Sequence, residues 1–299
     1  MLNRKRYIIV LVVLGVASVS AAVINAIYGK QEYWLWILLV VMTVWTVLRT
    51  RVYAPLQVFG TKFTMLVDYD LDIEEACRLA KLGADNAPTA RVKEIYGMYY
   101  AMSLYYKGDY EAAVRAFNQI DMKKLDGVYH ILIVAFIAYS EFELGNADAF
   151  DAAVERLHGI KTGIPAKYQN YAANYLEILE AMGKLSDDPE AYRAMMEKHF
   201  SRDDGYISTR LIHNYRIALY YKEIGDVAEM DKQLAFVIAN GKDHHTALQA
   251  QKLFQGTVNV EDYVIRDSIE EVQPADETAQ IETKEPDTDD GEDDQPEGV

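Results

Sequence analysis

The chain has 299 residues and a formal net charge of −16, and 16 of its 46 acidic side chains lie in residues 256 to 299. That segment holds only two basic residues, so the first 255 residues carry a net charge of −2. A nearly neutral folded part has no basic surplus to neutralise phosphates, which argues against nucleic-acid binding. The single cysteine, Cys77, excludes intramolecular disulfides, and its helical sequence context predicts a packing role.

Two apolar stretches near the N-terminus predict a transmembrane hairpin. Residues 7 to 28 carry no charge, and as a helix they would span about 33 Å, enough to cross the hydrocarbon layer. Residues 33 to 50 form a shorter second span that contains all three tryptophans, which are typical of membrane interfaces. We therefore expect residues 1 to 53 to form a two-span anchor.

Basic side chains flank this hairpin on one side. Arg4, Lys5 and Arg6 precede the first span, and Arg49 and Arg51 lie at the end of the second, which predicts that both termini are cytoplasmic. We expect a plasma membrane, by default a bacterial one. The alternative is a signal peptide cleaved near "SVSAA", but the apolar run continues past that point. Small residues on the first span predict close packing on the second span, with dimerisation through the same face as the alternative.

A repeated pattern organises residues 57 to 256. Gly108, Gly145, Gly183 and Gly225 each follow a helical, aromatic-rich stretch and precede a second helical stretch. A glycine at such a place can end one helix with a positive φ, and the Asp or Asn that often follows can begin the next helix. The pattern predicts stacked helical hairpins that turn at these four glycines.

The best-preserved copy reads "YKGDYEAAVRAF". Gly108 marks its turn, and the packing positions that follow are Tyr110, Ala113 and Phe117. This spacing resembles the tetratricopeptide repeat (TPR) family. The resemblance implies an all-α solenoid behind the membrane hairpin, in which the small side chain of Ala113 lets two helices approach closely.

Two further segments fit the resemblance. "LDIEEACRLAKLGADNAP" matches the second half of the repeat, with Leu71 in place of the turn glycine. "HTALQAQKLFQ", which begins at His245, is similar to the capping helix that a solenoid needs at an open end.

The resemblance also implies a concave groove lined by the first helix of each pair. The groove positions fall on Met98, Met102, Tyr105, Tyr106, Tyr139, Phe142, Tyr215 and Lys222. A wall rich in aromatic residues and methionine suits a peptide or a partner helix with apolar anchors. The alternative is that these side chains pack between repeats.

Catalytic and metal motifs are missing from the sequence. It has no phosphate-binding loop, dinucleotide fingerprint, GxSxG or HExxH pattern, so we expect no catalytic residues, no metal and no cofactor. His244 and His245 are adjacent and point to different faces of a helix, unlike a metal-binding pair at i and i+4. We expect them to be solvated at a helix end.

The C-terminal segment, residues 257 to 299, is predicted to be a disordered acidic tail. From Gln273 onward it has no aromatic residue and cannot bury enough surface to offset its chain entropy. Its expected role is solubility and spacing, or docking to a basic partner.

These features together predict a membrane-anchored scaffold or adaptor that is not an enzyme. It would present a cytoplasmic TPR-like groove to a peptide or protein partner. The first alternative is a peptide-sensing receptor or regulator that uses the same groove. The second is a membrane enzyme with an unrecognised site.

Overall fold

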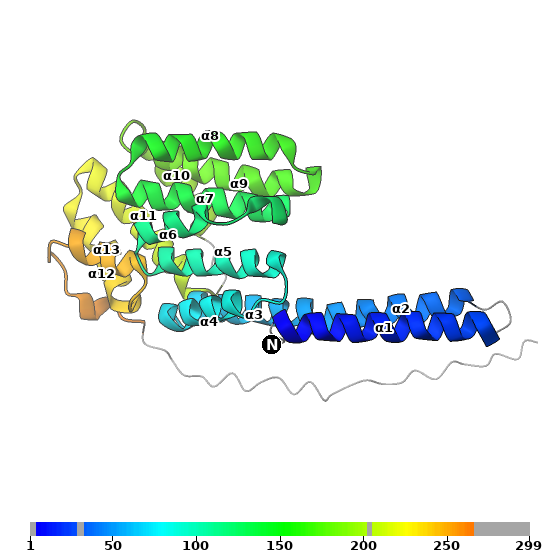
Figure 1. Cartoon of the computed structure of the whole chain (residues 1–299). Coiled ribbons are helices and arrows are strands. Elements are labelled where there is room, and N and C mark those ends of the chain that lie inside the picture. The colour runs from blue at the N-terminus through cyan, green and yellow to red at the C-terminus, as the bar shows by residue number, and fades with distance from the viewer. Residues whose placement is uncertain (1–3, 29–32, 202–204, 266–299) are drawn as a thin grey trace, which may run out of the picture. The chain divides into compact units, whose positions relative to one another are not determined.

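The computed structural model describes residues 4–28, 33–201 and 205–265, and within these ranges it is built from helices and contains no strand (Figure 1). The predicted all-α class is confirmed for this part of the chain. The helices are α1 (Arg4–Tyr28), α2 (Tyr33–Leu48), α3 (Ala54–Thr64), α4 (Ile73–Asp85), α5 (Ala90–Tyr106), α6 (Tyr110–Asn118), α7 (Gly127–Leu144), α8 (Ala147–Gly163), α9 (Ala166–Gly183), α10 (Pro189–Phe200), α11 (Ile207–Ile224), α12 (Val227–Asn240) and α13 (His245–Leu253). The hairpin connector (29–32) and most of the predicted tail (266–299) lie outside the described residues.

Helices α1 and α2 pack side by side and carry most of the exposed large apolar side chains among the described residues. Val19 and Ile27 of α1 are 65% and 66% exposed, and Trp45 of α2 is 59% exposed. Folded domains in water rarely leave so many large apolar side chains uncovered.

Length and apolarity alone single out a different helix. Of the described helices, only α7 is long and apolar enough to cross a membrane by these measures, and half of its apolar window is buried inside the structure. Val12–Ile24 within α1 is a shorter apolar stretch. The two-span anchor therefore stays a prediction.

No turn separates α2 from α3. Two π-helical segments, Arg49–Tyr53 and Met65–Tyr69, lie directly before and after α3. The backbone is therefore helical without interruption from Tyr33 to Tyr69. Pro55 has no N–H to donate to the preceding turn, so the helical hydrogen-bond ladder lacks one bond where the first π-helical segment meets α3.

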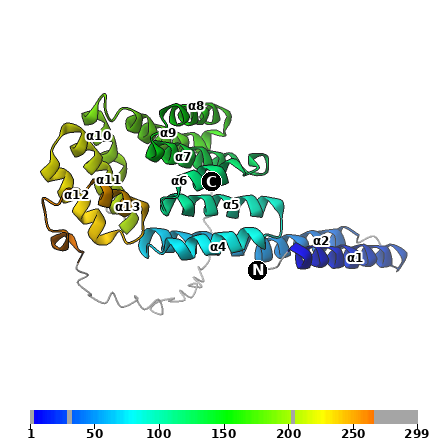
Figure 2. The same ribbon diagram turned by 60° about the vertical axis from the view of Figure 1, so that its left-hand side comes forward.

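From α4 to α12, consecutive helices pack against each other, as in stacked helical hairpins (Figure 2). Aspartate side chains cap the second helix of several pairs by accepting hydrogen bonds from backbone N–H groups in its first turn. These residues are Asp72 at α4, Asp109 at α6, Asp188 at α10 and Asp226 at α12. This bears out the expectation that an acidic or amide residue after the turn begins the next helix. In α6, Ala113 is fully buried.

Three of the four predicted turn glycines take the left-handed conformation. Gly108, Gly145 and Gly225 have φ of +83°, +73° and +79°. Gly183 ends α9, as its predicted place at a turn requires, but it does not take the positive φ. A Cβ at Gly183 would lie 3.2 Å from the ring of Phe150, so this glycine permits a close approach between helices.

The residues that connect α3 to α4, the first helix pair, contact α11 and α12, the last helix pair. Leu71 has a positive φ of +54°, and its side chain is buried in the core of α11 and α12. Ser208 Oγ donates a hydrogen bond to Asp68 Oδ1 at 2.7 Å, and Lys242 Nζ donates to the carbonyl oxygen of Asp70 at 2.7 Å. The two ends of the helical array, which comprises α3 to α13, are thus in contact, and the array is closed. The sequence did not predict this closure.

Helix α13 forms part of this closure. The hydroxyl of Tyr110 lies 3.1 Å from Nδ1 of His245, and the His245 side chain also approaches Gly108, the turn of the α5–α6 pair. The expectation that α13 caps an open end is therefore wrong, because its N-terminus is buried against α5 and α6.

The described structure continues past the predicted start of the tail. Asp231 accepts hydrogen bonds from the backbone N–H groups of Gln255 and Thr257, and Asn240 Oδ1 accepts one from Ile265. A 3₁₀ turn, Val260–Tyr263, packs on α12. The helical unit therefore extends to Ile265 rather than ending at residue 256.

Candidate functional site

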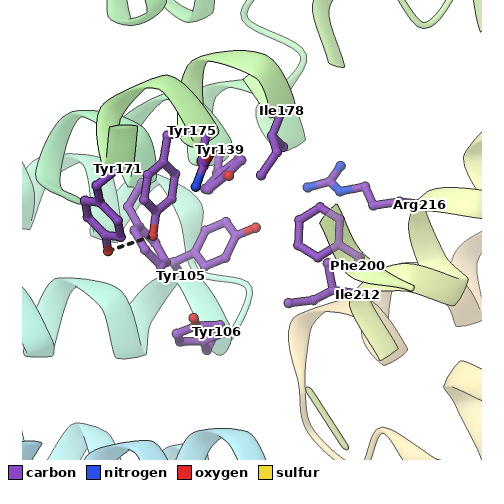
Figure 3. A pocket seen from close by; sticks show the side chains of 11 residues that line it. Tyr105, Tyr106, Tyr139, Tyr171, Tyr175, Ile178, Phe200, Ile212 and Arg216 are labelled. Carbon is purple, nitrogen blue, oxygen red and sulfur yellow. Dashed lines mark hydrogen bonds between the residues drawn. The ribbon is translucent and has the colours of Figure 1, made fainter. Parts of the chain in front are cut away.

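A pocket of about 290 Å³ lies between α5, α7, α9, α10 and α11 (Figure 3). Its walls are mostly aromatic and apolar, and Arg216 supplies a charged group among the described lining residues. These residues are Tyr105, Tyr106, Phe136, Tyr139, Tyr171, Asn174, Tyr175, Ile178, Phe200, Ile212 and Arg216. A concave apolar site with few polar groups is the usual form of a ligand pocket.

The last turn of α5 supplies one wall. The ring of Tyr105 packs edge-on against Phe136 of α7, with centroids 5.2 Å apart and an interplanar angle of 89°. Tyr106 points in another direction because it is the next residue on the helix, and its ring lies 5.8 Å from Phe136. Contacts of this kind hold aromatic rings in fixed orientations.

Helix α9 supplies a second wall. Tyr171, Asn174, Tyr175 and Ile178 are spaced at i, i+3, i+4 and i+7, so they share one helix face. The hydroxyls of Tyr171 and Tyr175 lie 3.3 Å apart (Figure 3). Tyr171 is 38% exposed and Ile178 is 8% exposed, so this face runs from the mouth of the pocket to its interior.

The tyrosine walls are uncharged at neutral pH. Burial raises the pKa of Tyr105 and Tyr175 well above the ordinary value, and it raises those of Tyr106 and Tyr139 as well. A phenol that keeps its proton can give or accept a hydrogen bond but is a poor general base.

A buried ion pair forms the polar end of the pocket. Arg216 Nη2 lies 3.0 Å from Glu143 Oε1, and the two side chains are 4% and 5% exposed. The hydroxyl of Tyr215 donates a hydrogen bond to the other oxygen of Glu143 at 3.2 Å, and the guanidinium lies over the ring of Phe142 at 5.3 Å. Nη1 of Arg216 is buried and has no hydrogen-bond partner among the residues that the structure describes.

The adjacent histidines lie behind the α5 wall. His244 and His245 are fully buried, and the His245 ring lies 4.5 Å from that of Tyr105. Burial lowers the pKa of His244 to about 3 and that of His245 well below its ordinary value, so both rings are neutral. The expectation that this pair is solvated is wrong, because the start of α13 is packed inside the closed array.

Three of the eight predicted groove residues line the pocket: Tyr105, Tyr106 and Tyr139. Met98 is 1% exposed and packs in the main core, and Tyr215 is 4% exposed and packs in the core of α11 and α12. Neighbouring helices cover these two side chains, so neither is open to a ligand.

The other three predicted groove residues also lie outside the pocket. Met102 is partly buried against the cluster around Phe63, and Phe142 lies beneath the guanidinium of Arg216. Lys222 is exposed near the end of α11.

The α9 wall and Arg216 were missed by the sequence prediction. Groove positions were assigned from the pairs that turn at Gly108, Gly145 and Gly225, and none was assigned to α9. The i, i+3, i+4, i+7 spacing of the α9 residues was a readable signal for one face. For Arg216 the sequence offered only a weak signal, a single arginine in the aromatic-rich stretch "IHNYRIALYY".

A search for metal-ligand groups and comparisons with known proteins give no further information about the pocket. Within residues 4–28, 33–201 and 205–265, no three His, Cys, Asp or Glu side chains are grouped so that they could hold a metal ion. No protein-family model matches the chain, and searches of curated proteins and of solved structures find no similar protein.

Proposed function

We propose that this protein is a membrane-anchored, TPR-like binding module that holds a peptide or protein partner at the membrane. It acts by recruitment, because an anchor confines the bound partner to the membrane surface and raises its local concentration. The observation that carries the proposal is the unbroken helical backbone from Tyr33 to Tyr69, which connects an apolar hairpin to the array that contains the pocket.

The exposed apolar surface of α1 and α2 supports the anchor. Within α1, the uncharged residues 7 to 28 correspond to about 33 Å of helix, enough for the hydrocarbon layer. The 16 residues of α2 are fewer, but the helical backbone continues through Arg49 and Arg51, whose long side chains can reach the headgroups. By the positive-inside rule, the N-terminus, the array and the C-terminus are cytoplasmic, by default in a bacterial cell.

The pocket supports the binding role. It combines aromatic walls, one polar end and a mouth marked by the exposed residues Tyr171 and Asn174. Fixed aromatic rings around an apolar hollow suit an anchor side chain of a partner, because such anchors supply most of the binding energy at protein interfaces.

Photo-crosslinking in cells tests this proposal with the full chain. A photoreactive phenylalanine at Asn174, at the mouth of the pocket, is expected to capture a partner protein. The same residue at Glu155, which is exposed on α8, serves as the control. Ile212→Trp, which fills the pocket, is expected to abolish the adduct formed from position 174. An equal adduct from both positions, or one that survives Ile212→Trp, would show that the partner does not use this pocket.

A peptide-sensing receptor is the second candidate, and the closure of the array favours it. Helices α5 and α11 line the pocket, and both also take part in the contact between the first and last pairs. A ligand in the pocket could therefore change the closure contact. Hydrogen exchange of α13, measured with and without the captured partner, separates the candidates: unchanged exchange indicates a scaffold, and altered exchange indicates a receptor.

A further inference from the structure

Arg216, at the polar end of the pocket, has a hydrogen-bond donor that none of the described residues satisfies. Arg216 is 3% exposed, and its Nη1 is buried without a partner although the side chain lines the pocket (Figure 3). Leaving a charged donor buried and unpaired is costly, so such groups usually mark the place of a missing acceptor. The acceptor would come from a ligand.

The charge around Arg216 indicates what kind of acceptor fits. Glu143 already balances the guanidinium at 3.0 Å, and both side chains are almost fully buried. No second charged side chain is among the described residues that line the pocket. A carboxylate on the ligand would place a second negative charge close to Glu143, away from water, with no cation left to balance it. The site therefore favours an uncharged acceptor such as a carbonyl oxygen.

The walls and the size indicate what is attached to that acceptor. Tyr105, Tyr139 and Tyr175 offer ring surfaces, and Ile178 and Ile212 complete an apolar lining. The volume of about 290 Å³ is at the small end of the range for ligand pockets, so it suits one large side chain rather than an extended molecule.

We propose that the pocket binds an aromatic or branched aliphatic group next to an uncharged carbonyl, whose oxygen accepts a hydrogen bond from Nη1 of Arg216. An internal residue of a peptide has this chemistry, and so does a small neutral amide. The inference deepens the proposed function by naming what the pocket recognises in a partner.

Two matched probes test the charge preference. N-acetyl-phenylalanine amide is neutral and N-acetyl-phenylalanine carries a carboxylate, and their apolar parts are the same. Calorimetric titration of the purified full chain in detergent is expected to show the amide binding at least about tenfold more tightly than the acid. Equal binding, or tighter binding of the acid, would overturn the proposal.

Substitutions at the polar end sharpen the test. Glu143→Gln keeps the shape of the side chain but leaves Arg216 unbalanced, so the preference is expected to reverse in favour of the acid. Arg216→Met removes the donor and is expected to weaken binding of the amide about tenfold or more. The matched control is Arg193→Met, which removes an arginine paired with Glu197 outside the pocket and is expected to leave binding unchanged.

Circular dichroism first establishes which variants are folded. If Arg216→Met does not fold, the Glu143→Gln result decides, because an unchanged preference in that variant would contradict the proposed role of the ion pair.

A longer neutral peptide distinguishes the two sources of the ligand. If a peptide with a central phenylalanine binds much more tightly than the single-residue amide, the pocket recognises a peptide chain; equal affinities indicate a small free molecule. Failure here is distinct from failure of the proposed function. If a partner is crosslinked only when the pocket is open, the proposed function remains supported even if the acid binds more tightly than the amide.

Discussion

Two histidines show how a single residue pair can be read wrongly from sequence. His244 and His245 stand at the start of a helix, where polar side chains are often solvated, yet both are fully buried. Nδ1 of each ring has a hydrogen-bonding neighbour, Thr246 for the first and Tyr110 for the second, whereas both Nε2 atoms are buried without a partner in the described part of the chain. A neutral ring tolerates this environment and an imidazolium does not.

The stability of the array should therefore depend on pH. In the unfolded chain both histidines titrate near 6.5, and in the folded chain their pKa values are lowered, to about 3 for His244. Below pH 6.5 the unfolded chain binds more protons than the folded chain, so the free energy of unfolding falls as pH falls and is fully recovered above about pH 7. Between pH 7.5 and 5.5 we expect a loss on the order of 1 kcal/mol for each histidine, measured by urea unfolding at the two pH values.

Substitution assigns this pH dependence to the buried pair. The variant His245→Asn is expected to lose part of it, whereas His158→Asn is expected to keep it, because His158 is a half-exposed side chain beside Glu180. His213 contributes in the same direction, since burial lowers its pKa too. A wild-type midpoint that is the same at both pH values would contradict the burial of these rings.

At the scale of elements, local signals predicted the helix pairs and their turns. Gly108, Gly145 and Gly225 have the positive φ that their positions indicated, and aspartates begin several of the following helices. Gly183 shows where the pattern fails. This glycine has no positive φ, and its missing side chain instead leaves room for the ring of Phe150. Sequence spacing describes a helix and its neighbours in the chain, and these parts were predictable for that reason.

The closure of the array was not predictable in this way. Ser208 and Asp68 are 140 residues apart in the sequence, and His245 and Tyr110 are 135 apart. No periodic pattern links such positions, and Leu71 resembled an imperfect turn rather than a contact. The sequence predicted only part of the pocket for the same reason. Arg216 and Phe200 come close to the other lining residues only when the whole helical array is folded.

The variant Leu71→Ala tests the closure at the level of elements. Leu71 is 4% exposed and packs with α11 and α12, so its truncation is expected to cost about 2 to 5 kcal/mol in free energy of unfolding. Hydrogen exchange should increase in α11 and α12 as well as in the first pair. Leu82→Ala, at a leucine that is 50% exposed on α4, is the control and should cost under about 0.5 kcal/mol. Protected amides in α11 and α12 of the Leu71→Ala variant would contradict the closed arrangement.

For the whole molecule, the apolar hairpin and the acidic C-terminal segment were read from composition, and the anchor stays a prediction. Exposed side chains on α1 and α2 are consistent with it, since Val19, Ile27 and Trp45 are all more than half exposed. What composition could not show is the absence of a linker: α2 runs into α3 without a turn.

Reporter fusions test the predicted topology. Alkaline phosphatase is expected to be inactive when fused after Val299, because that end is predicted to be cytoplasmic, and active when fused after Tyr28, at the end of the first span. A fluorescent protein that folds only in the cytoplasm should give the opposite pattern. Phosphatase activity after Val299 would contradict the predicted orientation. If the chain is equally soluble with and without residues 1 to 53, the predicted anchor is wrong.

The contact between the first and last pairs also has a consequence for folding kinetics. In an open stack of repeats each pair contacts only its neighbours, so folding can start anywhere and spread, and partly folded forms persist. Here Leu71, Ser208 and His245 gain their partners only after the intervening chain has been ordered. Such distant contacts slow folding and join the pairs into one unit. The array should therefore unfold in a single cooperative transition, and loss of α13 should loosen the turn at Gly108 as well as its own end of the chain.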